Sequence, residues 1–349
     1  MRRRNFKYLL CACVIVCIYY FFGVSDYIHS KSFDDNFDYP LNINIKSIVD
    51  DVLSGKKVTV TPINYYPYRF LTNSGKCSTT HKLDLFIVVK SAMDHFGHRD
   101  AIRQTYGQEN VPGRTVKTLF FLGIDGKQKS SLQKQIDKEM ADFKDIIQMD
   151  FIDNYYNNTI KTMMSFRWVY EHCPTADYYL FTDDDMYISV HNLLVYIHDR
   201  EATRKPEPAA FTTNYKSITD TAETDSDFLY TGYVFNSAPQ RFRSSKWRVS
   251  LVEYQWDRWP AYVTAGAYVL SNKTLKVMYI ASLFVKHFRF DDIYLGIVAK
   301  KVGIVPKHCP DFYFYKKKFS PDGYKDVIAS HGYEDHAELI RVWCEMNSL

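Results

Sequence analysis

Short apolar runs alternate with amphipathic stretches between residues 83 and 182. Runs of strand length lie at 83–89, 116–122, 145–151 and 178–182. Between them, apolar residues recur at the spacing of one helix face over 98–106, 130–143 and 159–172. Strands separated by helix-length crossovers predict a parallel, doubly wound α/β sheet, whose ligands bind beyond the carboxyl ends of the strands.

The remaining segments have weaker patterns. Residues 25–80 contain three prolines and no sustained periodicity, and we expect them to form a stem. From about residue 211 the chain is rich in Tyr and Trp, and we expect some antiparallel strand with a few helices covering one end of the sheet. The patterns divide the chain into a tail (1–7), an apolar segment (8–24), the stem and a large folded domain (81–349).

The apolar segment 8–24 contains no charged residue in 17 positions and follows four basic residues within 2–7. At 1.5 Å per residue, a helix of this length just spans a hydrocarbon core of about 30 Å. A cleaved signal peptide has similar features, but bulky aromatic residues at 19–22 occupy the place of a small-residue cleavage site. We therefore predict an uncleaved anchor, with the tail in the cytosol and the chain from about residue 25 in a lumen.

Composition narrows the range of partners. Hydrophobic residues make up 46% of the chain, which is enough for a real core and excludes disorder over the whole length. The net charge of +4 comes from the tail, because without its four basic residues 40 basic residues face 40 acidic ones. A neutral body has no broad positive field for a polyanion, so we expect no nucleic-acid partner.

Beyond the apolar segment, the cysteines and two sequons suit a lumenal environment. The four cysteines there are Cys77, Cys173, Cys309 and Cys344. In an oxidising compartment they allow three pairings, among which the sequence does not choose, and their spacing fits no zinc pattern. The sequons make Asn157 and Asn272 candidate glycosylation sites.

The sharpest chemical feature is the acidic run Asp183-Asp184-Asp185, directly after the apolar run 178–182. Such a run also occurs as a helix cap. However, adjacent carboxylates at the end of a buried strand repel one another, and a bound divalent cation relieves that repulsion. Since hard oxygen ligands select Mg²⁺ or Mn²⁺, we favour metal binding over capping.

Two further segments are less specific. Asp291 and Asp292 open an apolar helix pattern, where capping and catalysis are equally compatible with the sequence. The loop at 259–271 combines aromatic and small residues. Aromatic faces suit sugar rings, although core packing is the default role for any single aromatic residue.

Six segments lie along the chain in a fixed order: RDAIRQTY (99–106), FFLG (120–123), DFIDNYYNNTIK (150–161), DDD (183–185), WPAYVTAGAYVLS (259–271) and FDDIYLG (290–296). Together they resemble glycosyltransferase family 31, the β-1,3-galactosyltransferases and their β-1,3-N-acetylglucosaminyl and N-acetylgalactosaminyl relatives. The resemblance covers roughly residues 83–345. It implies a GT-A (Rossmann-like) fold, a type II Golgi membrane protein, Mn²⁺ and a UDP-sugar donor, with UDP-galactose as the first choice, and inversion at the anomeric carbon.

The resemblance also assigns roles to the acids of the first motif and to one histidine. It implies that Asp185 ligates the metal, that His331 completes the metal shell, and that Asp183 lies at the same site. Asp183 and Asp184 are expected to face the uridine ribose and the diphosphate. Without the resemblance, a lone histidine such as His331 is more often a surface residue.

Roles for four other residues follow from the same resemblance. Asp292 matches the general base, and Asp291 is the next candidate. Arg99 and Arg103 match the first motif and are expected to support the donor site, with structural salt bridging as an equal alternative.

The chain departs from the family pattern at several positions without losing a proposed catalytic group. The usual Trp is Tyr106, the usual Glu before the base is Asp291, a usual Leu is Asn158, and a frequent Lys before the acidic run is replaced at 181–182. These departures leave the donor and the acceptor glycan, on lipid or protein, unassigned. A homodimer also remains open.

Two other classes of function compete with a transferase. A membrane-anchored glycosidase would also need paired carboxylates, but the acidic run and the ordered motifs count against it. A non-catalytic Golgi glycan-binding homologue would be expected to have lost the acids, all of which are present.

Overall fold

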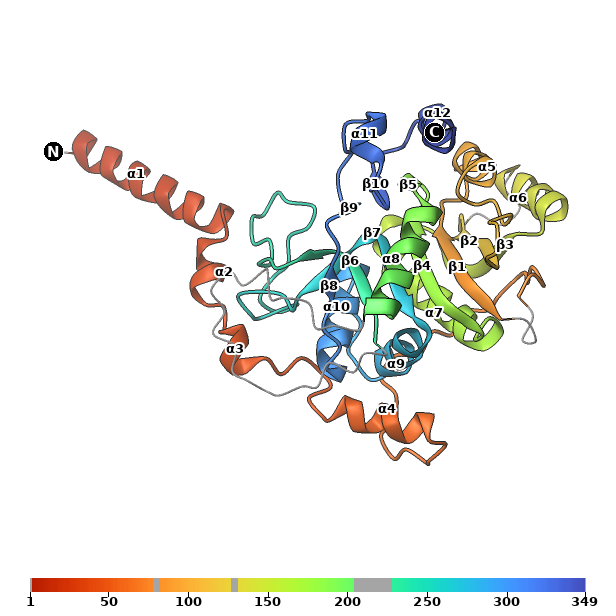
Figure 1. The fold of residues 1–349 in the computed structure, drawn as a ribbon. Helices are drawn as coiled ribbons and strands as arrows, with labels where there is room; N and C mark the ends of the chain where they lie inside the picture. The colour runs from red at the N-terminus through yellow and green to blue at the C-terminus, as the bar shows by residue number, and fades with distance from the viewer. Residues whose placement is uncertain (1, 78–81, 127–130, 204–227, 349) are drawn as a thin grey trace.

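The structure is a computed structural model that describes residues 2–77, 82–126, 131–203 and 228–348. In these residues the centre of the fold is a mixed sheet of seven strands (Figure 1). Across the sheet the strands are β3 (Ile146–Ile152), β2 (Val116–Ile124), β1 (Leu83–Lys90), β4 (Ala176–Asp183), β7 (Tyr262–Ser271), β6 (Tyr230–Phe235) and β8 (Lys307–His308). The first part of the Tyr- and Trp-rich region expected from about residue 211, residues 211–227, lies outside the described residues.

The sheet has a parallel half and an antiparallel half. Strands β1 to β4 pair in parallel, whereas β7 pairs antiparallel with both β4 and β6. The four strands predicted from the apolar runs form the parallel half, so the expected α/β class is confirmed. The expected antiparallel addition is also present, and it extends the same sheet beyond β4.

Helices cover both faces of the sheet because each central strand buries both of its faces. On β1, Phe86 and Val88 join one core, and Leu85, Ile87 and Val89 join the other. The first core receives residues from α4 (Ile45–Leu53), α7 (Asn158–His172), α9 (Asn272–Ser282) and α10 (Asp291–Val302). The second receives residues from α5 (Phe96–Gln104), α6 (Ser131–Phe143), α8 (Val190–Thr203) and α12 (His336–Asn347).

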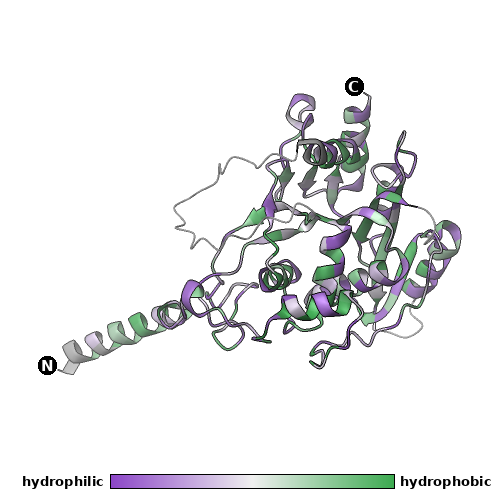
Figure 2. Ribbon diagram, turned by 60° about the horizontal axis from the view of Figure 1, so that its bottom comes forward, coloured by the Kyte–Doolittle hydropathy of each residue, from purple (hydrophilic) through white to green (hydrophobic). Residues whose placement is uncertain are grey.

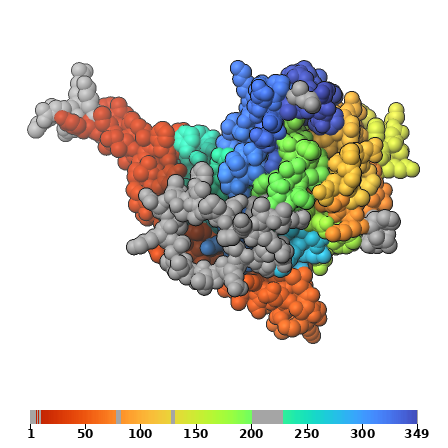
Figure 3. All heavy atoms as spheres, in the orientation of Figure 1, coloured from red at the N-terminus to blue at the C-terminus, as the bar shows by residue number. Residues whose placement is uncertain are grey.

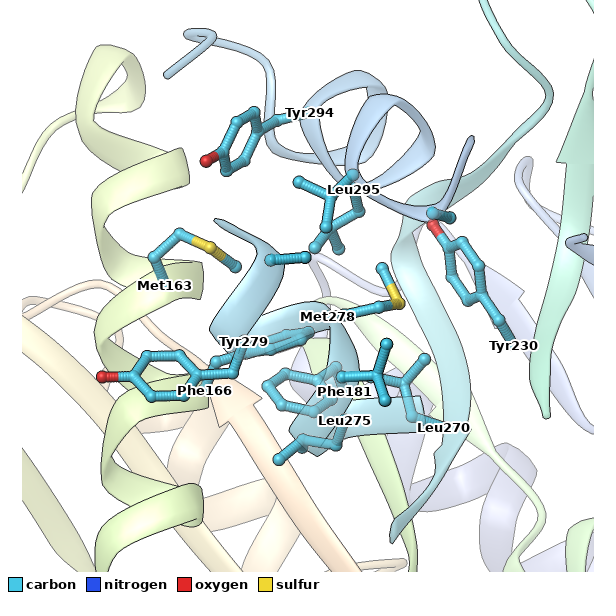
Figure 4. Close-up of a cluster of buried hydrophobic side chains, with 14 of the residues drawn as sticks. Met163, Phe166, Phe181, Tyr230, Leu270, Leu275, Met278, Tyr279, Tyr294 and Leu295 are labelled. Atoms are coloured by element: carbon cyan, nitrogen blue, oxygen red, sulfur yellow. The ribbon is translucent and has the colours of Figure 1, made fainter. Parts of the chain in front are cut away.

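The first core supports the strand that carries the acidic run (Figure 4). Phe181 stacks on Tyr268 of the neighbouring strand with ring centroids 5.1 Å apart and contacts Phe166 of α7 at 4.6 Å. All three side chains are fully buried. Two residues before Asp183, the strand is therefore fixed from the next strand and from a helix.

A second, three-stranded sheet brings a distant segment to the same place. It consists of β5 (Met186–Ile188), β10 (Ala329–His331) and β9 (Phe312–Tyr313). His331 pairs with Met186 in antiparallel register. Because Met186 follows Asp185 directly, this pairing places His331 beside the acidic run. Helices α11 (Pro321–Tyr324) and α12 lie beyond this sheet, with α12 next to α5 (Figures 1 and 3).

The N-terminal region contains α1 (Arg2–Phe21), α2 (Val24–Ile28) and α3 (Phe33–Asn36) before α4. Helix α1 projects away from the rest of the molecule, and its later turns are predominantly hydrophobic (Figures 1 and 2). No helix within the described residues meets the length and apolarity needed to cross a membrane.

Much of the segment expected to be a stem packs against the folded domain. Tyr39, Ile45 and Val49 are buried in the first core. The side-chain amide of Asn64 donates to the Ser282 carbonyl at 2.6 Å and to the Tyr294 hydroxyl at 2.9 Å. This segment packs on the domain because α4 and its neighbours have an apolar face that covers α9 and α10. Residues 39–64 are therefore structurally part of the domain.

A disulfide bond fastens this N-terminal segment to the sheet. It joins Cys77 to Cys173, which lies just after α7. Of the bonds that the sequence left open, the structure contains Cys77–Cys173, and Cys309 and Cys344 are not joined to each other. Cys344 is an exposed thiol on α12.

Candidate functional site

A buried lysine joins the two acidic motifs. Lys90 ends β1 and lies in register with Asp183 at the end of β4. Its ammonium is 3.1 Å from Asp183 Oδ1 and 2.9 Å from Asp291 Oδ2. Burial disfavours the charge on Lys90, but the two carboxylates outweigh burial and raise the pKa of the ammonium. Two motifs more than a hundred residues apart in the sequence thus meet at one cation.

Asp184 lies in a pocket of hydrogen-bond donors. It accepts a hydrogen bond from Ser91 Oγ at 2.5 Å, and His95 Nδ1 lies 3.0 Å away. Burial opposes ionisation, yet the hydrogen bonds and the His95 charge lower the pKa of Asp184 below its ordinary value. The same contact raises the pKa of His95. Asp184 is therefore an ionised acid that fixes the loop after β1.

Asp185 is the acid that faces His331. The distance from His331 Nε2 to Asp185 Oδ2 is 3.2 Å, and the hydrogen bond raises the pKa of the histidine. Asp185 Oδ1 is buried and has no hydrogen-bond partner among the described residues. Within the same residues, no group of three His, Cys, Asp or Glu side chains is placed to hold a metal. Asp183, expected at the metal, is bound instead to Lys90.

Asp291 and Asp292 begin α10 but have different surroundings. Asp291 is buried, pairs with Lys90 and accepts a hydrogen bond from Thr162 Oγ1 at 2.7 Å. These contacts outweigh burial and lower its pKa. Burial and the neighbouring Asp291 charge raise the pKa of Asp292 to about 7. Asp292 accepts a hydrogen bond from the Ile293 amide at 2.7 Å, and in the described part of the chain no cation lies within salt-bridge distance.

This difference separates the two catalytic candidates. A carboxylate with a pKa near 7 is suited to take up a proton at neutral pH, whereas a carboxylate held by an ammonium is a weaker base. The two acids therefore differ in their affinity for a proton: Asp292 has the raised pKa, and Asp291 is held by Lys90 and Thr162.

Arg99 and Arg103 form a buried salt-bridge network on the far side of the loop after β1. Both contact Glu139, and Arg103 also pairs with Asp145 at 2.8 Å. Arg99 donates to Ser91 Oγ and to the carbonyls of residues 92 and 93. Both arginines therefore form structural salt bridges, which was the alternative to support of the donor site. Arg99 also affects the site by holding the loop at Ser91.

A cavity of about 490 Å³ opens beside the acidic run. It is lined by residues from the ends of β1, β3 and β4 and the start of α7, including Lys90, Asp153, Tyr155, Lys161, Asp183, Asp184 and Asp185. Lys161 Nζ is buried, lies 2.7 Å from Asp153 Oδ1 and donates to the Ser91 carbonyl at 2.7 Å. The cavity lies beyond the carboxyl ends of the parallel strands, as expected from the fold class.

Four residues of the site have no role that the sequence alone predicts: Lys90, Ser91, His95 and Lys161. A signal for Lys90 was present, because a lysine that ends an otherwise apolar strand of a buried sheet must find a carboxylate partner. Ser91 and His95 carry no local signal, since their roles depend on the pairing of β1 with β4.

The two candidate glycosylation sites differ in accessibility. Asn272 Nδ2 donates to the carbonyls of Pro174 and Ala176, at 2.7 and 2.6 Å, and to Tyr179 at 3.0 Å. A glycan on this nitrogen would break these contacts. Asn157 Nδ2 donates to the Ile152 carbonyl at 2.7 Å. Of the two positions, Asn157 is more compatible with a glycan on the folded protein.

Comparison with known proteins identifies the class to which this site belongs. The family described as "Galactosyltransferase" matches residues 97–310. The chain therefore belongs to the galactosyltransferase family, and the protein is a hexosyltransferase.

Particular relatives match nearly the whole chain. "Beta-1,3-galactosyltransferase brn" of Drosophila melanogaster is 37% identical over 93% of this chain and 91% of that protein. "Lactosylceramide 1,3-N-acetyl-beta-D-glucosaminyltransferase" of Homo sapiens is 31% identical over 95% of this chain and 83% of that protein. Among solved structures, the galactosyltransferase LgtC in complex with donor and acceptor sugar analogues matches with a TM-score of 0.37 at 11% identity, covering 76% of this chain and 97% of LgtC.

Proposed function

We propose that the protein transfers galactose from UDP-galactose, with inversion, to the 3-hydroxyl of a terminal sugar on a glycolipid or glycoprotein glycan. The observation that carries this proposal is Lys90, which joins Asp183 of the acidic run to Asp291 beside Asp292. The Drosophila relative is a β-1,3-galactosyltransferase, which supports galactose as the donor sugar and the β-1,3 linkage. The human relative is an N-acetylglucosaminyltransferase, so transfer of N-acetylglucosamine is the second candidate reaction.

A donor screen tests the proposal. The protein is incubated with UDP-galactose, UDP-N-acetylglucosamine and UDP-N-acetylgalactosamine and a panel of acceptor glycosides, and UDP release is measured. We expect the highest release with UDP-galactose and a β-1,3-linked product. A preference for UDP-N-acetylglucosamine would select the second candidate, and a protein that binds a glycan without UDP release would be a non-catalytic homologue.

The proposed mechanism is a single in-line displacement, because one substitution at an α-linked donor gives a β-linked product. The acceptor hydroxyl is a weak nucleophile and must lose its proton as the new bond forms. Asp292 accepts that proton, and its raised pKa makes it an effective base near neutral pH. Lys90 keeps Asp291 in place, so the start of α10 stays aligned with the acidic run.

We propose that Asp185 and His331 hold Mn²⁺. The partnerless Oδ1 of Asp185 and the nearby His331 nitrogen support this, since both are donors that Mn²⁺ accepts. Bound Mn²⁺ would offset the negative charge that develops on the UDP leaving group. The remaining ligands would come from the donor diphosphate and water.

Metal removal and one substitution test this site. We expect EDTA to abolish activity and Mn²⁺ to restore it better than Ca²⁺. Asp185→Ala should abolish Mn²⁺-dependent UDP binding, measured by calorimetry, and leave the melting temperature nearly unchanged. Asp100→Ala, at an exposed acid on α5, is the control and should bind UDP normally. Unchanged Mn²⁺ dependence in Asp185→Ala would reject the assignment.

We also propose a single-pass type II Golgi membrane location with the catalytic domain in the lumen. The support is the sequence pattern of a basic tail before 17 uncharged residues. Protease treatment of intact microsomes should remove only the tail, and a mature N-terminus beyond residue 25 would reject the anchor. Sedimentation of the lumenal part would decide whether the protein is a homodimer.

A further inference from the structure

An aromatic side chain lies one helical turn from the proposed base. Gly296 follows Asp292 by four residues on α10, so the two positions share one face of the helix. A Cβ atom built on Gly296 would lie 2.5 Å from the Cβ of Tyr262, which shows how closely β7 approaches this face. Burial, and to a lesser degree the charge of Asp292, raise the pKa of the Tyr262 phenol to about 12. Tyr262 therefore adjoins the place where the acceptor hydroxyl must bind.

From Tyr262 a continuous row of rings leads to the surface, and we call it the aromatic wall. Its members are Tyr262, Phe235, Tyr233, Phe314 and Tyr315. Phe235 lies 5.8 Å from Tyr262 and 4.8 Å from Phe314, and Phe314 lies 5.1 Å from Tyr315, between ring centroids. Exposure rises along the row, from 9% for Tyr262 to 41% for Phe314 and 50% for Tyr315.

We propose that the aromatic wall binds the acceptor glycan, with the sugars that precede the reacting terminal sugar stacked along Phe314 and Tyr315. This inference rests on the proposed function. A sugar ring presents C–H groups with a slight positive charge on its apolar face, and the face of an aromatic ring is negative. A row that starts at the base and ends in solvent is the arrangement that a chain of sugars requires. The wall therefore selects acceptors of at least two sugars.

The chemistry of the wall fits a glycan better than a lipid chain. Three of its five members are tyrosines, and the Tyr262 hydroxyl lies 3.1 Å from Ser237 Oγ. Hydroxyl groups beside aromatic faces can bond the equatorial hydroxyls of a sugar, whereas an acyl chain gains nothing from them. A ceramide on the wall is the competing occupant, and the experiment below separates the two.

The test compares short and long acceptors in matched variants. The probes are methyl β-galactoside against lactose, and methyl β-N-acetylglucosaminide against chitobiose, because each pair has the same terminal sugar. The variants are Phe314→Ala and Tyr315→Ala. The control is Phe143→Ala, a 46% exposed aromatic residue on α6 next to the opposite part of the sheet.

For Phe314→Ala and Tyr315→Ala we expect the KM of the disaccharide to rise about 2- to 10-fold, as for the loss of one aromatic contact. The KM values of the methyl glycoside and of the UDP-sugar should stay unchanged, and Phe143→Ala should behave as wild type. Equal effects on both acceptor lengths, or the same loss in Phe143→Ala, would overturn the proposal. A loss seen only with ceramide-linked acceptors would assign the wall to the lipid.

A binding measurement distinguishes failure of this proposal from failure of the proposed function. Saturation-transfer NMR with irradiation of aromatic protons, in the presence of UDP and diamagnetic Mg²⁺, should show saturation transfer to lactose or chitobiose in wild type and less in Phe314→Ala. If saturation transfer to the disaccharide is observed but no sugar is ever added to it, the aromatic wall is a glycan-binding site and the proposed transferase function is wrong. If the enzyme adds sugar but saturation transfer to the disaccharide is unchanged in Phe314→Ala, the aromatic wall is not the acceptor site.

Discussion

The parallel and antiparallel halves of the sheet surround their carboxylates differently. At the end of the parallel strands, Asp183 is bound to Lys90, Asp184 to Ser91 and His95, and Asp185 to His331. At the start of α10, which packs on the antiparallel strand β7, Asp292 faces no cation in the part of the chain that the structure describes.

The difference teaches how one site can hold acids for binding and an acid for proton transfer. The hydrogen bonds and the His95 charge lower the pKa of Asp184, which keeps that acid ionised and fixed, whereas burial raises the pKa of Asp183 to about 6 despite its pair with Lys90. A carboxylate that is buried beside a second negative charge holds its proton more tightly, which suits a base. Lys90 contributes to this difference, because it pairs with Asp291 and not with Asp292.

The first prediction, with the largest expected effect, is the substitution Asp292→Asn. Removal of the proton acceptor should lower kcat by roughly 10²- to 10⁴-fold. If Asp292 only accepted the hydrogen bond from the Ile293 amide, the change would cost little, because the side-chain oxygen of Asn can accept the same bond. The measurement is kcat together with UDP affinity, and UDP affinity should be retained because the acidic run is intact.

The matched control for that experiment is Asp291→Asn. Since Asp291 is paired with Lys90 and Thr162, its loss should reduce the free energy of unfolding, whereas Asp292→Asn should not. Near-normal kcat in Asp292→Asn would return Asp292 to a structural role and make Asp291 the next candidate.

The second prediction concerns the lysine on which the comparison depends. Lys90→Met removes the cation shared by Asp183 and Asp291 and leaves two buried carboxylates without it. Breaking a buried pair in this way costs about 3–5 kcal/mol of unfolding free energy. Urea unfolding measures the loss. Lys82→Met, which removes an exposed pair with Asp177, is the control and should cost about 0–1 kcal/mol.

An equal, small loss in both lysine variants would mean that Lys90 does not bind the two acids together in solution. The division of roles between Asp291 and Asp292 would then have to be explained by burial alone.

The sequence predicted the parallel half of the fold well because its signals are local. The apolar run at 83–89 became β1 and the charged, periodic stretch at 130–143 became α6, each within one or two residues. The short strands β8 and β9 have two residues each, and no periodicity can reveal strands of that length. Each is defined by its pairing with another strand, β8 with β6 and β9 with β10.

The candidate site was predictable only in part for the same reason. The acidic run and the Asp291-Asp292 pair are visible as residue types, and the family resemblance gave them roles. The shared bond to Lys90 depends on the register of β1 against β4 and on the approach of α10, which are tertiary facts. The packing of residues 39–64 on α9 and α10 was likewise missed, because a segment with prolines and no periodicity can still bury individual side chains.

The third prediction tests whether the N-terminal segment stabilises the binding half. The disulfide between Cys77 and Cys173 closes a loop across a separation of 96 residues and fixes that segment to the end of α7. The paired change Cys77→Ser and Cys173→Ser should lower the unfolding free energy by about 2–5 kcal/mol. Cys344→Ser, at an exposed thiol, is the control and should have little effect.

Activity separates a purely stabilising bond from one that shapes the site. We expect kcat of the folded double variant, measured well below its melting temperature, to stay near wild type, because Cys173 lies at the opposite end of α7 from Lys161. A large loss of kcat at full folding would link the N-terminal segment directly to the acids.

The smallest expected effect, a change of about tenfold in rate, comes from pH and tests Asp292 without changing other residues. Asp292 must be ionised to accept a proton, and its pKa is raised to about 7, so kcat/KM should rise about tenfold between pH 6 and 8.

The stability of the fold should change with pH in the opposite direction. The folded-state pKa of Asp292 is above the unfolded value, so its stabilising contribution is present at low pH and is lost as the pH rises through about 7. His95 and His331 also have raised pKa values and lose stabilisation over rising pH, so wild type alone is ambiguous. The decisive quantity is the melting temperature of Asp292→Asn minus that of wild type, in which the histidine contributions cancel. This difference should grow as the pH rises from 6 to 8, and a constant difference would show that Asp292 does not titrate in this range.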